Sequence, residues 1–285
     1  MALENVIGVD HAVVVVKNLD HAAENWKRLG FTVSPRGTHS AKMGTGNYTI
    51  MLGEDYLELL GVLDATEHNA PTRAFLARTG GGIERVAFTT SDAAKGAEEI
   101  RARGYPPIGP TDFERPVTLP DGRQSAAKFA TFQWPIDQAP GGVRLFACQH
   151  KTRDTVWIPE LRQHANMAKR IERILIVSPE PKADAGHLAT MIDIPARGER
   201  DGTWLVPSGP GRADFVFLAR DVLDRQYPDV PMAGLPERGG IGLVLAVDDL
   251  ASARRALGVA AIQSGEALVV PPAAGNNAML AFVAK

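Results

Sequence analysis

One order of elements recurs four times along the chain: a strand, a helix and then further strands. The best-defined copy begins at residues 8–16, a short β-branched apolar run that favours a buried strand. The pattern then predicts a helix over 21–30 and strands over 31–34, 47–52 and 56–62. This order is β-α-β-β-β, and its repetition predicts an α+β protein built from four such modules.

The later copies open with apolar strands like the first one. The strand over 82–88 begins with Gly-Ile-Glu-Arg, which aligns with Gly-Val-Asp-His at residues 8–11. Similar openings lie at 171–177 and 241–247, each followed by a helical pattern and two more strands. Pairing the modules in chain order gives two halves, each an open barrel of about eight strands.

Composition and charge exclude several classes of partner. The chain has 285 residues, a net charge of −2 and no long basic run, so neither nucleic acid nor an anionic membrane surface is an expected partner. Cys148 is the single cysteine, which excludes an intrachain disulfide and a cysteine zinc site. No apolar run approaches the ~20 residues of a membrane span, and we expect a cytoplasmic protein.

The first strand carries a polar pair, Asp10 and His11, within an apolar run. Period-two alternation places His11 on one face with Val13 and Val15. A buried histidine has to be hydrogen-bonded, bound to a metal or facing a cavity. The strand therefore predicts either a satisfied core histidine or a site.

Several motifs together resemble the vicinal oxygen chelate superfamily, and within it the glyoxalase-like group. They occupy residues 8–15, 29–31, 39–47, 56–59 and 146–150. The resemblance implies a glyoxalase-like domain over 1–152 that holds the candidate site, a linker over 153–167 and a second, degenerate glyoxalase-like domain over 168–285. It also implies a pocket, often with a divalent metal, enclosed by each pair of modules.

In the first module the resemblance implies that His11 and Glu58 occupy ligand positions on the first and last strands. Histidine nitrogen and carboxylate oxygen suit Zn, Fe, Mn, Ni or Co without choosing among them. The resemblance also makes Glu58 a candidate catalytic group. The alternatives are a core histidine bonded to Asp10 and an ion pair of Glu58 with Arg85.

The second module departs from the pattern of the superfamily. Its ligand positions fall on Arg85 and on Leu145 or Phe146, and none of these side chains ligates metals. His150 has the parity of Phe146 and lies at the end of its strand, where it could contact a ligand. The first-strand positions of the third and fourth modules fall on Arg173 and Leu243, which predicts no metal site there.

Arg85 suggests an anion site, because a guanidinium binds carboxylates or phosphates bidentately. Charge compensation of Glu84 or Glu58 is the alternative. In the glyoxalase-like group the Gly-rich loop edges the pocket, which makes Thr45 and Asn47 candidate ligand contacts and His39 a candidate general base. A solvent-exposed loop histidine is the alternative for His39.

Two functions follow from the resemblance. One is an enzyme of lyase, isomerase or dioxygenase type that acts on a small oxygenated metabolite, with a divalent metal or without a cofactor. The other is a non-catalytic protein that sequesters a small molecule in the same pocket. A structural paralogue whose incomplete site is vestigial is a further alternative. The expected partner is a small-molecule ligand, and a homodimer is expected by analogy alone.

Overall fold

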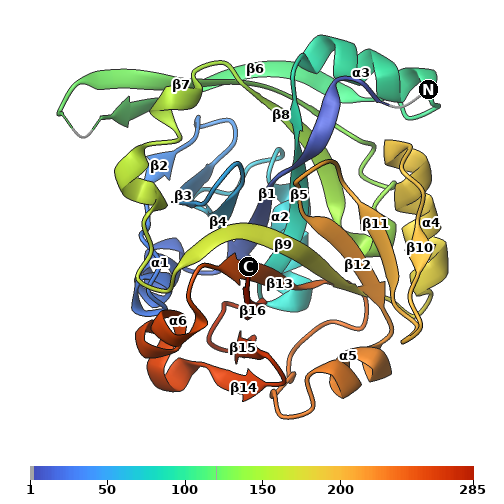
Figure 1. Cartoon of the computed structure of the whole chain (residues 1–285). Coiled ribbons are helices and arrows are strands. Elements are labelled where there is room, and N and C mark those ends of the chain that lie inside the picture. The colour runs from blue at the N-terminus through green and yellow to red at the C-terminus, as the bar shows by residue number, and fades with distance from the viewer. Residues whose placement is uncertain (1–2, 120) are drawn as a thin grey trace.

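The structure is a computed structural model that describes residues 3–119 and 121–285. Its strands form one large mixed sheet that is not closed on itself (Figure 1). The first two modules lie at the top and left of Figure 1, and the C-terminal module lies at the bottom. The α+β prediction with four modules in two open-barrel halves is confirmed.

The first half contains two modules, separated in sequence by helix α2. Its elements are β1 (Val6–Val16), α1 (Leu19–Arg28), β2 (Gly37–Thr38), β3 (Thr45–Met51), β4 (Tyr56–Val62), α2 (Ala70–Thr79), β5 (Gly82–Thr90), α3 (Ala93–Ala102), β6 (Ile108–Thr118), β7 (Gln124–Gln133) and β8 (Arg144–His150). Residues 151–167 then hold two short 3₁₀ turns, Arg153–Thr155 and Pro159–Arg162.

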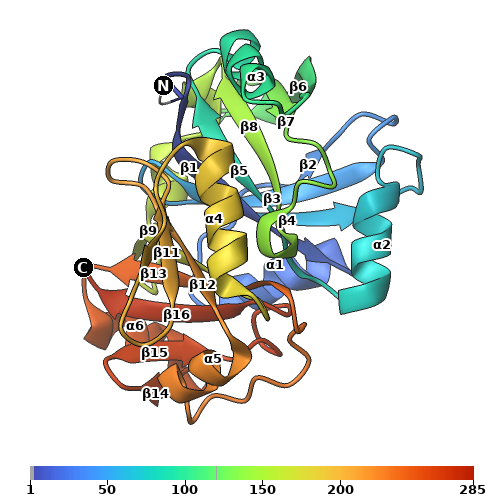
Figure 2. The ribbon, with the colours of Figure 1, turned by 90° about the vertical axis from the view of Figure 1, so that its right-hand side faces the viewer.

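The second half repeats this order, with helix α5 between its two modules. Its elements are β9 (Ala168–Val177), α4 (Pro181–Ile192), β10 (Arg197–Gly198), β11 (Trp204–Pro207), β12 (Asp214–Leu218), α5 (Arg220–Gln226), β13 (Gly239–Val247), α6 (Leu250–Leu257), β14 (Ile262–Ser264), β15 (Ala267–Val270) and β16 (Met279–Ala284). Helix α4 packs on β11 and β12 and crosses in front of them in Figure 2.

Strand pairing follows one rule in all four modules. The first strand of a module pairs in parallel with the last, and the remaining strands continue outward as antiparallel neighbours. Modules join through their first strands, β1 with β5 and β9 with β13, both antiparallel. A single bridge between β13 and β5 links the halves, so the first strands of all four modules lie together at the centre of the sheet.

Three local predictions were wrong. Residues 31–34 form no strand, although they place Ser34 against Thr49 of β3. No strand was predicted over 108–118, but β6 spans these residues. It pairs with β7 alone, and an edge strand tolerates prolines such as Pro110 and Pro116. Helix α2 was missed because its apolar residues lack a continuous stripe and only Thr72 of the helix is buried.

Helices α1, α3, α4 and α6 cover the convex side of the sheet and enclose the main core. Helix α1 starts at Asn18, whose side chain accepts a hydrogen bond from the backbone N–H of His21, and it buries Trp26. The core on this side contains residues from all four modules, among them Phe88 and Phe282. The two halves therefore share one apolar core.

The concave faces of the two halves differ. In the second half, apolar residues from α5 and the segment after it pack against β9 and β13; they include Leu223, Val230 and Met232. Hydrocarbon therefore fills that concave face. In the first half, β2 and β6 at the two free edges contact each other, and the concave face keeps a buried polar cluster.

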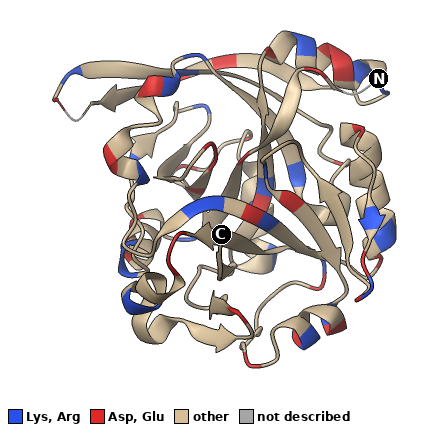
Figure 3. Cartoon of the chain, viewed as in Figure 1, with Lys and Arg blue, Asp and Glu red and all other residues tan. Residues whose placement is uncertain are grey.

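None of the helices in the described ranges is both long and apolar enough to cross a membrane. Positive and negative residues are interspersed along both halves (Figure 3).

Candidate functional site

The candidate site lies on the concave face of the first half, which we call the cup. The cup is built from β1, β3, β4, β5, β6, β7 and β8. One end is covered by Phe75 and Leu76 of α2, which pack against Val13 and Val15. The other end is covered by Val156 and Trp157 of the linker segment, which pack with apolar residues of β3, β4, β7 and β8.

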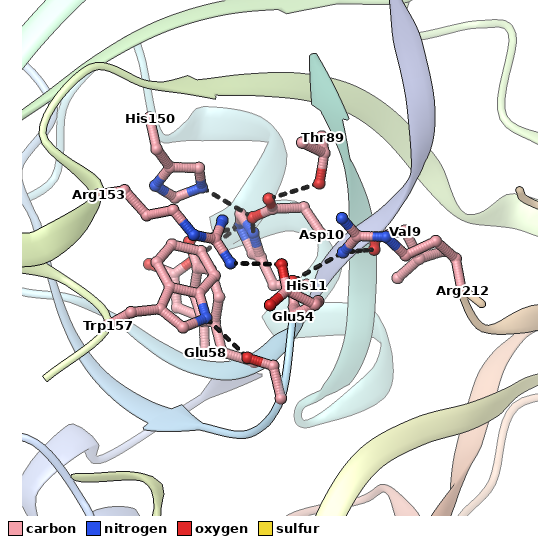
Figure 4. Close-up of polar contacts among 12 residues, drawn as sticks. Val9, Asp10, His11, Glu54, Glu58, Thr89, His150, Arg153, Trp157 and Arg212 are labelled. Carbon is pink, nitrogen blue, oxygen red and sulfur yellow. Dashed lines mark hydrogen bonds and ion pairs between the residues drawn. The ribbon is translucent and has the colours of Figure 1, made fainter. Parts of the chain in front are cut away.

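A β-bulge at Asp10 aims two neighbouring side chains into the cup. Val9 pairs with Phe88 and His11 pairs with Ala87, so Asp10 is an extra residue in β1. Such an insertion interrupts the alternation of faces. Asp10 and His11 therefore point the same way and hydrogen-bond each other (Figure 4).

The bulge recurs at the corresponding place in every module. The extra residues are Glu84 in β5, Glu172 in β9 and Ile241 in β13. This register supports the alignment of Glu84 and Arg85 with Asp10 and His11. In the fourth module it places Gly242, rather than the predicted Leu243, at the position of His11.

Asp10 is fully buried and binds both histidines of the cup. Its Oδ1 accepts hydrogen bonds from His11 Nδ1 at 2.6 Å and from His150 Nε2 at 2.9 Å, and its Oδ2 accepts one from the Thr89 hydroxyl at 2.8 Å. Burial alone would raise the pKa of Asp10, but the charges and hydrogen bonds of His150 and His11 outweigh burial and hold this pKa well below its usual range. Asp10 is therefore an ionised acceptor.

A loop of the second half holds the backbone of the bulge. Val9 N–H donates to Ser208 Oγ at 3.0 Å, and Arg212 donates to the carbonyl oxygens of Val9 and Glu54. The approach is close at Gly8, which has φ +148°, because an added Cβ would lie 2.5 Å from Arg212 Cγ. The second half thus supports the site without contributing a side chain to the polar cluster.

The structure brings His11 and Glu58 together on one face. Because Nδ1–H of His11 donates to Asp10, Nε2 is left facing Glu58, with Nε2 and Oε2 3.5 Å apart. Asn47 donates to the other oxygen, Oε1, at 2.7 Å and so fixes the carboxylate. His11 also stacks on Tyr56, whose hydroxyl lies 3.4 Å from Nε2.

Burial, followed by the negative charge of Asp10, raises the pKa of Tyr56 well above its usual value. Tyr56 is therefore a neutral phenol that can donate to His11.

His11 and Glu58 supply two ligand atoms, which is half of a four-coordinate metal site. Two ligands about 2.1 Å from one tetrahedral ion lie roughly 3.4 Å apart, which matches His11 Nε2 and Glu58 Oε2. The matching positions of the second module are Arg85 and Phe146, and neither side chain can ligate a metal. Across residues 3–119 and 121–285, no group of three or more His, Cys, Asp or Glu residues is placed to hold an ion. Water or substrate would have to complete the shell.

Arg85 pairs with Glu84, as the charge-compensation alternative expected. Its Nε donates to Glu84 at 2.7 Å and its Nη2 donates to the Thr72 hydroxyl at 2.7 Å. Arg144 of β8 binds the other oxygen of Glu84, so two guanidinium groups share one carboxylate. Burial would raise the pKa of Glu84, but Arg85 and Arg144 lower it. Thr72 ties helix α2 to this group.

The Gly-rich loop places His39 beside the cup. His39 Nδ1 lies 2.8 Å from the Thr45 hydroxyl, and Thr45 is buried. Burial lowers the pKa of His39, and Arg115 and Arg85 add to that effect while Glu58 opposes it. His39 is therefore neutral near pH 7, which is the form that a general base requires.

His150 and Cys148 lie on β8 beside the cluster. His150 Nε2 binds Asp10, its Nδ1 is buried without a partner among the described residues, and its ring lies edge-on to Trp157. Burial raises the pKa of the Cys148 thiol well above its usual value. Cys148 is thus a buried, neutral thiol.

Sequence reasoning missed Arg115 and gave Tyr56 no role. Arg115 lies on β6, where no strand was predicted. The signal available in the sequence was the alternation of Phe113, Arg115 and Val117 with other residues, and in the structure these odd positions are half-buried while the even ones are exposed. Tyr56 pairs in register with His11, and its position two residues before Glu58 was the available signal.

Comparison with known families gives one clear match. A family model described as a glyoxalase-like domain matches residues 9–192, more than half of the chain. A comparison with curated proteins finds no match.

Solved structures with the same fold cover the whole chain at low sequence identity. A hypothetical protein from Staphylococcus aureus is 15% identical with a TM-score of 0.69, covering 97% of this chain and 99% of its own. A mutant 4-hydroxymandelate synthase from Streptomyces coelicolor is 16% identical with a TM-score of 0.58, covering 94% of this chain and 78% of its own. A fusion of a xylose isomerase-like TIM barrel with a 4-hydroxyphenylpyruvate dioxygenase is 15% identical with a TM-score of 0.61, covering 100% of this chain and 50% of its own.

Proposed function

Because the chain belongs to the glyoxalase-like domain family of the vicinal oxygen chelate superfamily, we propose that the cup is an enzyme active site of isomerase or lyase type. In this proposal His11 and Glu58 move a proton on a small oxygenated metabolite. The observation that carries it is the Asp10–His11–Glu58 arrangement, a buried carboxylate that orients an imidazole toward a second carboxylate.

The proposed reaction is proton transfer next to a carbonyl group. Glu58 takes a proton from the carbon beside the carbonyl, and the electron pair of the broken C–H bond moves to the carbonyl oxygen. Returning the proton to the same carbon completes an epimerisation. In a 2-hydroxy carbonyl compound, returning it to the neighbouring carbon completes an isomerisation, with the hydroxyl proton moving to the former carbonyl oxygen. His11 Nε2 can take the proton over from Glu58, and His39 is a second candidate base because it is neutral near pH 7. No oxidant or reductant is required.

Hydrogen–deuterium exchange tests this proposal without knowledge of the product. The purified protein is incubated in D₂O with a panel of 2-oxo acids and 2-hydroxy carbonyl compounds, and loss of the C–H signal is followed by proton NMR. Replacing the base of such a site costs roughly 10²–10⁴-fold in rate, so Glu58→Gln should abolish measurable exchange. The control is Glu54→Gln, an exposed carboxylate bound to Arg153. Equal exchange by the Glu58→Gln protein would refute the role of Glu58.

A metal-dependent site is the second candidate, favoured by the 3.5 Å separation of His11 Nε2 and Glu58 Oε2. Those two residues would hold the ion, which would act as a Lewis acid on a substrate oxygen. Metal analysis of the purified protein separates the two candidates. One stoichiometric divalent ion that is lost in His11→Ala supports the metal site, whereas exchange that persists after removal of metal supports the Glu58 base alone.

Binding without turnover is the remaining candidate. It is favoured by the burial of His11, which is 2% exposed and packed between Tyr56 and Phe146. A protein that binds compounds of the panel but exchanges none of their protons would support this candidate.

A further inference from the structure

A cavity of about 350 Å³ opens beside the cup, between β3, β6 and the linker segment. Its walls combine apolar residues, among them Val117, Val156 and Leu161, with polar ones that include Arg36, Thr49 and Arg115. Arg36 is paired with Asp20, and Thr49 lies directly opposite Glu58 in the β3–β4 ladder. The volume lies in the range of small-molecule sites.

Arg115 points from β6 toward this space. It shares the cup face of β6 with Phe113 and Val117, and its guanidinium passes close over Gly37 of β2, where an added Cβ would lie 3.4 Å from Nη1. Arg115 therefore lies at the place where the two free edges of the first half, β2 and β6, meet.

Arg115 differs from the other arginines near the cup in the partners that its charge has among the described residues. Among residues 3–119 and 121–285, no carboxylate lies within ion-pair distance of its guanidinium and no acceptor takes a hydrogen bond from it. Arg85 and Arg144, in contrast, are both bound to Glu84. Burial lowers the pKa of Arg115, and the nearby Tyr56 and Glu58 oppose that effect. A half-buried guanidinium with unused donors, on the wall of a cavity that also carries apolar side chains, is a binding group for an anion.

We propose that this cavity is the subsite for a small organic acid, with the carboxylate on Arg115 and the apolar body against Val117, Val156 and Leu161. The Thr49 hydroxyl would donate a second hydrogen bond to the carboxylate. This inference rests on the proposed function in that it names the substrate class of the same site. It assigns to Arg115 the anion-binding role that the sequence suggested for Arg85.

The test uses a matched pair of probes, benzoate and benzamide, which differ in charge but hardly in shape. Isothermal titration should show that benzoate binds at least about tenfold more tightly than benzamide, because a charge-assisted pair contributes that much or more. Arg115→Gln should remove this preference, and Arg115→Lys should restore part of it. Arg123→Gln is the control, since Arg123 is an exposed arginine of the same β6–β7 hairpin. Circular dichroism confirms that each variant is folded.

Three outcomes overturn the inference. They are equal binding of benzoate and benzamide by the native chain, unchanged benzoate preference in the Arg115→Gln protein, and tighter binding of phenyl phosphate than of benzoate. The readout is independent of turnover, so the two proposals can fail separately. If Arg115 binds benzoate but the protein exchanges no protons, the subsite is supported and the proposed function is refuted. If exchange depends on Glu58 but the Arg115→Gln protein still prefers benzoate, the proposed function is supported and the subsite is refuted.

Discussion

Asp55 gives the sharpest prediction of the structure, because it is a carboxyl group buried at the junction of the two halves. It is 4% exposed, its Oδ2 accepts the Ile171 N–H of β9 at 2.8 Å, and its Oδ1 has no described partner. Burial raises the pKa of Asp55 to about 7, against the opposing effects of the Ile171 hydrogen bond and the charge of Arg212.

The pKa of Asp55 is thus higher in the folded chain than in the unfolded chain, where it lies near 3.8. The folded state binds the proton more tightly, so the contribution of Asp55 to the free energy of unfolding is greatest below pH 4. This contribution falls by about 1.4 kcal/mol per pH unit as the pH rises toward 7, and it levels off above pH 7. Between pH 5 and pH 8, ionisation of Asp55 should lower the free energy of unfolding by about 2–3 kcal/mol.

Asp55→Asn keeps the shape and the acceptor for Ile171 but cannot ionise. Urea unfolding of both proteins, at several pH values from 5 to 8, measures the difference in unfolding free energy. That difference should shift by about 2–3 kcal/mol in favour of the variant as the pH rises. Asp112→Asn is the control, since its exposed carboxylate pairs with Lys151. A difference that stays constant with pH, or that shifts toward the native chain, would refute the reasoning.

Three further predictions concern the architecture of the site. Gly8→Ala should lower the free energy of unfolding by about 2 kcal/mol, because the backbone angle φ of Gly8 and the side chain of Arg212 leave no room for a Cβ. Gly186→Ala should raise the free energy of unfolding by roughly 0.5–1 kcal/mol, because Gly186 lies on a helix with open space around it. Thermal denaturation measures both changes. Asp10→Asn should lower stability by about 3 kcal/mol and reduce proton exchange, and unchanged urea midpoints would contradict the buried network. Glu84→Gln leaves Arg85 and Arg144 facing each other and should lower stability by about 3–5 kcal/mol in urea unfolding; a value near zero would show that solvent already separates the two charges.

The order of strands and helices in the modules was predictable because it depends on local sequence patterns. Apolar β-branched runs such as 8–16 act over a few residues, and so do Asn18 and Asp92, whose side chains cap the first turns of α1 and α3. Alternation also predicted that His11 shares a face with Val13. These features depend on the chain's own neighbours and not on distant contacts.

The contacts of the site depended on long-range geometry. The position of Asp10 inside the cup comes from a bulge, which a strict two-residue period does not contain. Arg115 was missed because Pro116 argues against a strand until it is known that β6 lies at an edge. The partner of Arg85 was left open by the sequence, because choosing between Glu84 and Glu58 requires knowing that β5 also bulges.

The four bulges mean that every module offers the same doubled position at the centre of its first strand, whatever side chains occupy it. Because the bulge inserts one residue, an acid and the polar residue after it point in the same direction there. The third module already holds Glu172 and Arg173 at this place, while the fourth holds Ile241 and Gly242. New chemistry could therefore be introduced into the other modules by exchanging two adjacent residues, with the backbone that presents them already in place.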